Sequence, residues 1–418
     1  MFCAKKSFFV GTLWLCIPVI WIGSLLTDRF INPNPVNHIF VATRSAMRGK
    51  DKVNVTGVDS RKPCYKVVYT WLDERDEFHV KLLFKKVGRF SCPGLSCGVQ
   101  IEHGRNLTEL AASDVVFLFY KHKWDWQAVL KHQSDRQKWV FWTSESPRHI
   151  PPRRIIPPQE YSNRTYDYIM SFRKGASNED AYLSEGGYGY FDGTRPSVQN
   201  DDNRNWAENK TKLVAWVASN CYPAMLSYDR TGFVNALARH IRVDTFGHCG
   251  SRPCKDIATC GLQEYRFYLA LENSECQDYI TEKFWYNSLT LGLVPIVFGA
   301  PKENYLKEAP PNSFIFIPDF PSIAKLAAYL VELSENDDLY NRYFQWKKEG
   351  SVESFLQYSN FEPESLCRNV VRRVLKDEEI ESDKKERKHV RKPVVDDWDK
   401  WWTKSCKYTV TGFPIPDK

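Results

Sequence analysis

Several patterns typical of metal or repeat proteins are missing from this sequence of 418 residues. None of its 12 cysteines form a C-x-x-C pair, and the irregular spacing of Cys249, Cys254 and Cys260 argues against zinc. Its one plain D-x-D motif, at 397–399, lies in the C-terminal tail, away from every predicted strand. No internal repeat is visible, which argues against a repeat protein. We therefore predict no metal site.

Charged residues are also absent from Phe8–Leu26, a run rich in Phe, Leu, Ile, Val and Trp. About twenty such residues span the core of a bilayer. Lys5 and Lys6 precede the run, so the positive-inside rule predicts a cytosolic tail (1–7), a transmembrane signal anchor (8–26) and a lumenal remainder. A cleaved signal peptide is the alternative, but the run is long and no A-x-A site follows it.

Two further features fit a lumenal chain. Four Asn-x-Thr acceptor sites for N-glycosylation occur, at Asn54, Asn106, Asn163 and Asn209. Cys3 and Cys16 precede or lie within the anchor, so ten cysteines remain beyond it. An even number in an oxidising compartment indicates disulfides, whose connectivity the sequence leaves open.

Apolar segments recur after a stem at 27–62, separated by stretches that admit helices. The expected strands are Tyr65–Trp71, Asp114–Tyr120, Trp139–Thr143, Tyr166–Ser171, Leu213–Ser219, Arg242–Phe246, Phe267–Glu272, Val294–Phe298 and Phe314–Pro318. Near-continuous apolar strands alternating with helices predict an α/β protein with parallel sheets. Gly186–Asn209 interrupts the pattern and indicates an interdomain link. It would separate an N-terminal lobe (63–205) from a C-terminal lobe (206–365), which a charged tail (366–418) follows.

The most informative window is Tyr265–Tyr305, where a buried strand is followed by a polar loop and a helix start. Ligands of such sheets bind beyond the carboxyl ends of the strands, so Glu272, Asn273, Glu282 and Lys283 are candidates for a site beside a helix N-terminus suited to phosphate. A capped helix start with a surface salt bridge explains these residues equally well. The residues alone do not decide between the two interpretations.

This window resembles the signature of the α1,3-fucosyltransferase family, F-Y-L-x-x-E-N-S-x-x-x-D-Y-I-T-E-K-F-x-x-N. The similarity extends over about 66–357. Other family landmarks are Phe141–Pro147, Tyr166–Arg173, Trp216–Asn220 with Arg230, and Val243–Gly247. The resemblance implies a GT-B fold, in which two Rossmann-like lobes face a cleft, and an inverting transfer from GDP-fucose in the Golgi lumen.

The resemblance also assigns roles to single residues. Glu145 matches the proposed general base, which takes the proton of the attacking hydroxyl. The residues that match the donor site are Arg230, Asp244, Asn273, Tyr279, Glu282 and Lys283. Of these, Arg230 and Lys283 would bind the diphosphate, and Asp244 would lie with Phe246 near the nucleoside. No fixed cofactor is expected; Mn²⁺ or Mg²⁺ could stimulate transfer without being fixed.

The acceptor is less well defined. Cys221, Cys249, Cys254, Cys260 and Cys276, with their neighbours, resemble the branch that modifies the innermost GlcNAc of N-glycans. The family's other branch acts on N-acetyllactosamine. One departure is that the usual C-x-x-C after the last domain is lost, so Cys367 must pair elsewhere or stay free.

Two alternatives come from other classes of protein. One is a catalytically silent lumenal glycan-binding relative. The other is a nucleic-acid-binding protein that uses the charged stretch 376–392, and the net charge of +7 is compatible with it. The intact site residues argue against the first alternative. The anchor and the glycosylation sites argue against the second, so we expect the 376–392 stretch to be a solvated helix and no nucleic acid to bind.

Overall fold

The computed structural model describes residues 63–72, 80–81, 83–119, 125–150, 155–161, 165–183, 187–194, 204–222, 226–254, 257–355, 361–383, 393–408 and 414–416. The predicted anchor (8–26) and stem (27–62) lie outside these residues. Within the described ranges, no helix is long and apolar enough to cross a membrane.

The first lobe contains a six-stranded sheet in the order β2-β3-β1-β4-β5-β6. Its strands are β1 (Tyr65–Trp71), β2 (Gly88–Phe90), β3 (Gly98–Gly104), β4 (Val115–Leu118), β5 (Lys138–Thr143) and β6 (Tyr168–Ser171). All neighbouring pairs are parallel except β2 with β3. The short helices α2 (Leu107–Ala112) and α3 (Trp126–Leu130) connect its strands.

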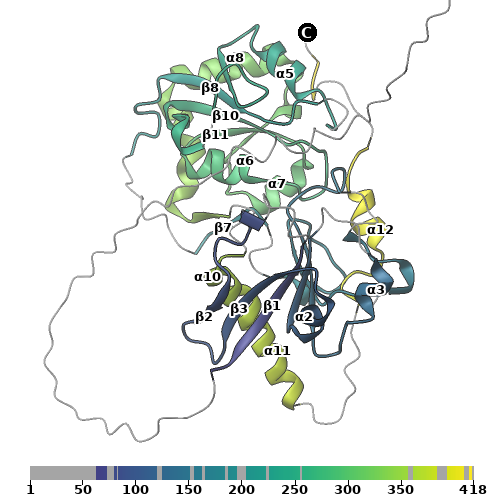
Figure 1. Ribbon diagram of the computed structural model, residues 1–418. Helices are drawn as coiled ribbons and strands as arrows, with labels where there is room; N and C mark the ends of the chain where they lie inside the picture. The colour runs from purple at the N-terminus through teal and green to yellow at the C-terminus, as the bar shows by residue number, and fades with distance from the viewer. Residues whose placement is uncertain are drawn as a thin grey trace, which may run out of the picture.

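The second lobe contains a five-stranded, wholly parallel sheet in the order β12-β11-β10-β8-β9. Its strands are β8 (Lys212–Val217), β9 (Val243–Phe246), β10 (Tyr265–Leu271), β11 (Val294–Phe298) and β12 (Ile315–Phe316). The helices of this lobe are α5 (Arg230–Leu237), α6 (Glu282–Phe284), α7 (Lys302–Glu308), α8 (Ile323–Glu335) and α9 (Asp337–Asn341). A π-helical segment (Trp285–Thr290) continues α6. Figure 1 shows the two sheets in separate halves of the molecule.

Side-chain alternation explains how β10 is covered on both faces. Phe267, Leu269 and Leu271 join a core with α5 and α8, whereas Tyr268 and Ala270 join the core that continues into the first lobe. Because successive side chains of a strand point to opposite faces, a strand covered on both sides is apolar throughout. This is why the sequence pattern identified β10.

The predicted α/β class and all nine predicted strands are confirmed, with bounds shifted by one or two residues in most cases. Four strands were not predicted: β2, β3, β7 (Gly189–Asp192) and β13 (Ser351–Ser354). The strands β7 and β13 form an antiparallel pair. The predicted link at Gly186–Asn209 therefore includes a strand that pairs with a segment beyond the second sheet.

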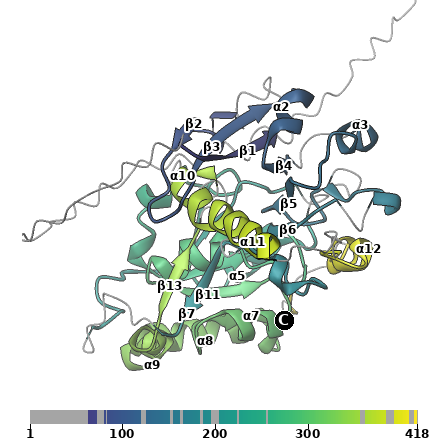
Figure 2. The same ribbon diagram turned by 90° about the horizontal axis from the view of Figure 1, so that it is seen from below.

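The C-terminal part of the chain returns to the first lobe. Its helices are α10 (Pro363–Leu366), α11 (Arg372–Asp383) and α12 (Trp398–Trp401). In Figures 1 and 2, α11 lies across the first sheet. Ion pairs from Lys66 to Glu378 and from Lys138 to Glu381 join α11 to this sheet. The helix expected in the 376–392 stretch is observed as far as Asp383 and is mostly exposed there, although Glu378 and Glu381 pair with the sheet. Its remainder lies outside the described residues.

All ten cysteines beyond the predicted anchor form disulfides, as expected for an oxidising compartment. The pairs are Cys64–Cys97, Cys92–Cys367, Cys221–Cys249, Cys254–Cys260 and Cys276–Cys406. Cys367, which lacks its usual local partner, joins Cys92 of the first lobe. Two of the bridges therefore tie the C-terminal part of the chain to the lobes.

Candidate active site at the interface of the two lobes

Glu145 lies two residues beyond the end of β5, at the carboxyl edge of the first sheet. All six residues of β5 are buried, which fixes the point where this loop begins. The Thr143 hydroxyl accepts a hydrogen bond from the Glu145 amide at 3.1 Å, and the Ser146 amide donates to Glu145 Oε1 at 2.9 Å. The loop thereby holds its own carboxylate at the sheet edge.

The second lobe supplies two more donors to the same oxygen. Tyr279 donates its hydroxyl hydrogen to Glu145 Oε1 at 2.8 Å, and Asn273 Nδ2 approaches that atom at 3.3 Å. The Ser274 hydroxyl donates to Asn273 Oδ1 at 2.9 Å, which orients the amide with its nitrogen toward Glu145. Ser146 and Ser274 also join their hydroxyls across the lobes at 2.8 Å. The two lobes therefore meet on the carboxylate of Glu145.

These contacts affect the ionisation of Glu145. Burial by itself raises the pKa of a carboxyl group, but His149, the Ser146 amide, Tyr279 and Asn273 together lower the pKa of Glu145 below its ordinary value. Burial lowers the pKa of His149, an effect that Glu145 opposes and that the nearby cations Arg230, Arg148 and Lys283 strengthen. Glu145 is thus ionised at neutral pH and can accept a proton.

A second polar cluster lies at the carboxyl end of β10, where Glu272 is fully buried. It accepts hydrogen bonds of 2.8 Å from the backbone amide and the hydroxyl of Thr281, the residue that caps α6. Lys283 Nζ lies 3.3 Å from Glu272 and 2.9 Å from Glu282. The capped helix start is therefore confirmed, but its lysine lies between carboxylates and is largely buried rather than part of a surface salt bridge. Binding of phosphate here stays a prediction.

The charge of Lys283 is stabilised by this arrangement. Burial disfavours the ammonium, but Glu272 and Glu282 raise the pKa of Lys283 above its ordinary value. Burial raises the pKa of Glu272, an effect that Lys283 opposes and Glu282 strengthens. Lys283 therefore stays charged at the start of α6, where the Thr281 hydroxyl and the carboxylates of Glu272 and Glu282 engage its ammonium group.

Arg230, the first residue of α5, is 2% exposed. Its Nη1 donates to the carbonyl of Leu271 at 3.0 Å and its Nη2 to that of Asn220 at 2.5 Å. The guanidinium thus ties the end of β10 to the loop that follows β8. The positive charge of Arg230 also acts on the site, because it is one of the charges that lower the pKa of His149.

Asp244 lies apart from these groups, within β9. It accepts a hydrogen bond from the Tyr265 hydroxyl at 2.7 Å and forms ion pairs with Arg242 and Arg252. Burial acts to raise the pKa of Asp244, but Tyr265 and the two arginines lower it. These partners are Tyr265 of β10, Arg242 directly before β9 and Arg252 in the loop after β9.

The structure thus brings most of the predicted residues into two neighbouring groups. One joins Glu145, Asn273 and Tyr279, and the other joins Glu282 and Lys283 through Glu272. Sequence reasoning missed His149 as a neighbour of Glu145. The signal is local, since the amides of His149 and Ile150 both donate to the Ser146 carbonyl, and this turn brings His149 near enough to affect the pKa of Glu145.

Two of the four predicted glycosylation sites can be examined. Asn106 and Asn209 are exposed, as an attached glycan requires, and Asn54 and Asn163 lie outside the described residues. In the part of the chain that the structure describes, no group of three His, Cys, Asp or Glu side chains could hold a metal. Asp397 caps α12, and Asp399 pairs with Lys404.

Comparison with known proteins identifies the family. Residues 207–391 match the model of "Glycosyltransferase family 10 (fucosyltransferase) C-term". Alpha-(1,3)-fucosyltransferase 7 of Bos taurus is 33% identical over 253 residues, covering 60% of this chain and 67% of that protein. The chain therefore belongs to glycosyltransferase family 10, the fucosyltransferases.

Other relatives show how far the match extends. Alpha-(1,3)-fucosyltransferase 4 of Mus musculus is 35% identical over 56% of this chain, and glycoprotein 3-alpha-L-fucosyltransferase A of Drosophila melanogaster is 33% identical over 62%. The chain spans about half the length of these two relatives, 50% and 48%. A crystal structure of an alpha1,3-fucosyltransferase with GDP-fucose matches at 16% identity with a TM-score of 0.45, covering 82% of this chain and 96% of that one.

Proposed function

We propose that this protein is an α1,3-fucosyltransferase of the GT-B fold, which transfers L-fucose from GDP-fucose to a GlcNAc of glycoprotein N-glycans with inversion. Family membership supports the reaction class. The observation that carries the proposal is the Glu145 carboxylate, which hydrogen bonds from Tyr279 and Asn273 of the other lobe help to keep ionised.

The reaction is a single displacement. The acceptor hydroxyl oxygen forms a bond to the anomeric carbon of fucose as the bond from that carbon to the GDP oxygen breaks. Glu145 takes the hydroxyl proton, a general-base contribution of about 10²–10⁴-fold in rate. The electron pair of the broken bond passes to the diphosphate, where Lys283 and Arg230 stabilise the charge.

Donor binding depends on side chains in this proposal. Lys283 meets the diphosphate at the start of α6, and Glu282 accepts hydrogen bonds from hydroxyls of the donor sugar or ribose. Arg230 acts through its charge and by fixing the two loops that its guanidinium joins. No fixed metal is required, and Mn²⁺ or Mg²⁺ would act only as a stimulant.

For the acceptor we favour the innermost GlcNAc of N-glycans. The disulfides of the cysteines that resemble this branch support it, as does the likeness to the Drosophila glycoprotein 3-alpha-L-fucosyltransferase A. N-acetyllactosamine is the competing acceptor, because relatives named alpha-(1,3)-fucosyltransferase 4 and 7 match at similar identity. We place the enzyme in the Golgi membrane as a single-pass type II protein with its catalytic part in the lumen.

The test uses the full chain, produced in the secretory pathway of a eukaryotic cell and extracted in detergent. It is incubated with GDP-fucose and either a GlcNAc-terminated trimannosyl N-glycan or an N-acetyllactosamine oligosaccharide. We expect transfer to the N-glycan, with fucose located on the innermost GlcNAc by mass spectrometry and an α linkage seen by NMR. Transfer to lactosamine alone would overturn the acceptor, and no transfer from folded protein to either acceptor would contradict the proposed activity.

A further inference from the structure

The residues directly after the Glu145 loop contact a distant segment of the chain. This segment, Ser405–Tyr408, follows α12 and is called the C-terminal strap below. It runs antiparallel to Glu275–Gln277 of the second lobe, with Cys276 opposite Cys406. The disulfide between these two cysteines closes the pair covalently. The strap is therefore attached next to the loop that supplies Asn273 and Ser274 to the site.

Hydrogen bonds on both sides of the disulfide strengthen this attachment. The Gln277 amide donates to the Ser405 carbonyl at 2.9 Å, and the Lys407 amide donates to the Glu275 carbonyl at 2.9 Å. Lys407 Nζ also pairs with the Glu275 carboxylate at 2.7 Å. With its backbone and a side chain both engaged, the strap has a defined register against the second lobe.

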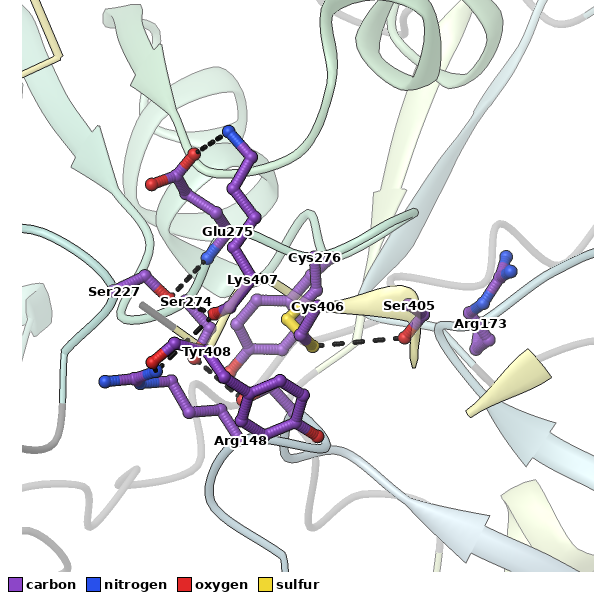
Figure 3. The surroundings of a disulfide bond; sticks show 12 residues. Arg148, Arg173, Ser227, Ser274, Glu275, Cys276, Ser405, Cys406, Lys407 and Tyr408 are labelled. Atoms are coloured by element: carbon purple, nitrogen blue, oxygen red, sulfur yellow. Dashed lines mark hydrogen bonds and ion pairs between the residues drawn. A yellow bond between two sulfur atoms is a disulfide. The ribbon is translucent and has the colours of Figure 1, made fainter. Parts of the chain in front are cut away.

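Arg148 connects the strap to the loop of the general base. Its Nη1 donates to the Tyr408 carbonyl at 2.6 Å and lies 3.5 Å from the Lys407 carbonyl, while its Nη2 donates to the Leu226 carbonyl at 2.7 Å. Figure 3 shows Arg148 beside the backbone of Lys407 and Tyr408, close to the Cys276–Cys406 disulfide. One guanidinium thus binds carbonyls of the strap and of the second lobe.

Arg148 is three residues from Glu145, with Ser146 between them. Ser146 is bound to Ser274 of the second lobe, so the loop is attached there at two points, Ser146 and Arg148. The contacts of Glu145 with Asn273 and Tyr279 depend on where these attachments hold the loop. A misplacement of about 1 Å at a catalytic group can cost about 10²-fold in rate.

We propose that Arg148 is a positioning residue for Glu145: it fixes the loop of the general base against the C-terminal strap, which the Cys276–Cys406 disulfide holds in register. The inference rests on the fucosyltransferase activity proposed above. It assigns to the strap, which lies far beyond both sheets in sequence, a part in forming the site. Arg148 itself touches neither donor nor acceptor in this account.

The test compares the full-length wild type with Arg148→Ala, Arg148→Lys and the control Lys404→Ala, an exposed residue close to the strap that pairs with Asp399. We expect Arg148→Ala to lower kcat by about 10- to 100-fold while KM for GDP-fucose and the calorimetric Kd for GDP stay within about threefold. Arg148→Lys should recover part of the rate, since one ammonium can still reach a carbonyl. Lys404→Ala should match the wild type.

The pH profile separates positioning from simple stabilisation. If the loop shifts, Glu145 loses donors that lower its pKa, so the acidic limb of kcat/KM should move to higher pH in Arg148→Ala and return part of the way in Arg148→Lys. The proposal would be overturned if Arg148→Ala kept both the kcat of the wild type and the pH of its acidic limb. A loss of GDP binding that equals the loss of kcat would also overturn it, because that pattern indicates general unfolding.

The disulfide is tested with Cys276→Ser, Cys406→Ser and the double variant. Each should lower kcat in the same direction as Arg148→Ala, and the double variant should be no worse than either single one, because all three break the same bond. If all three variants kept the kcat of the wild type, the disulfide would have no part in positioning the loop. An inactive wild type would instead contradict the proposed function, so the two failures are distinguishable.

Discussion

Glu145 and Glu272 are two glutamates of one site whose pKa values shift in opposite directions. Glu145 receives hydrogen bonds from Tyr279 and the Ser146 amide and has a lowered pKa. Glu272 also accepts two hydrogen bonds and lies beside Lys283, yet complete burial and the neighbouring Glu282 raise its pKa. Hydrogen bonding alone does not decide ionisation; the balance between burial and nearby charge does.

The comparison assigns different roles to the two residues. Glu145 keeps part of its surface exposed and stays ionised, as a base that meets a substrate must. Glu272 has no exposed surface, and its partners belong to the start of α6. We infer that Glu145 acts on the acceptor, whereas Glu272 holds Lys283 and the helix start in place for the donor.

The largest expected effect is on Glu145. Glu145→Gln should lower kcat by about 10²–10⁴-fold, because the amide cannot take the acceptor proton. The unfolding midpoint should fall slightly at neutral pH, because the lowered pKa of Glu145 means that the fold stabilises the carboxylate. The measurement is fucose transfer beside Glu332→Gln, an exposed glutamate of α8, which should behave as the wild type. A kcat within tenfold of the wild type would show that Glu145 is not the general base.

The next effect concerns Lys283. Lys283→Met leaves Glu272 buried without its cation and should destabilise the protein by about 3–5 kcal/mol. Transfer should fall by about 10²-fold, because the diphosphate loses a cation. Urea unfolding and transfer kinetics measure the two effects separately.

The double variant Glu272→Gln/Lys283→Met distinguishes the structural role of the pair from the role of Lys283 in donor binding. Removing both charges should restore most of the lost stability, since a neutral pair costs little to bury. Transfer should stay as low as in Lys283→Met alone. If transfer recovered together with stability, Lys283 would have only a structural role.

The smallest effect is expected at Asp244. Its pKa is lowered, as that of Glu145 is, but by groups of its own sheet and the adjoining loop. Asp244→Asn should lower thermal stability slightly and change kcat by no more than about threefold. Calorimetric titration with GDP checks the assignment to the nucleoside site. A rise in Kd above tenfold would favour that assignment, whereas an unchanged Kd would contradict it.

Local patterns predicted much of the fold. The strands Tyr65–Trp71 and Val294–Phe298 were predicted with their observed bounds, and the helix start at Thr281 was recognised from its capping residue. The missed strands are short, glycine-containing or rich in polar residues, as in the Gly98–Gly104 strand. Their pairing with a neighbouring strand, rather than their composition, makes them part of a sheet.

The site was predictable only in its residues, not in its contacts. Family resemblance selected Glu145 and Tyr279, but the hydrogen bond between them joins residues separated by 134 positions in the sequence. Likewise, Cys92–Cys367 spans 275 positions, and no spacing rule gives such a pair. Arg148 could not be assigned because its partners are backbone carbonyls, which leave no signature in side-chain identity.

The pH dependence of kcat/KM in the wild type and in Tyr279→Phe tests the central claim most directly. A base works only when ionised, so transfer should be lost only as pH falls through the lowered pKa of Glu145. Tyr279→Phe removes one of the groups that lower this pKa, so its acidic limb should lie at higher pH. An acidic limb at the same pH in both proteins would contradict the conclusion that the second lobe keeps the base ionised.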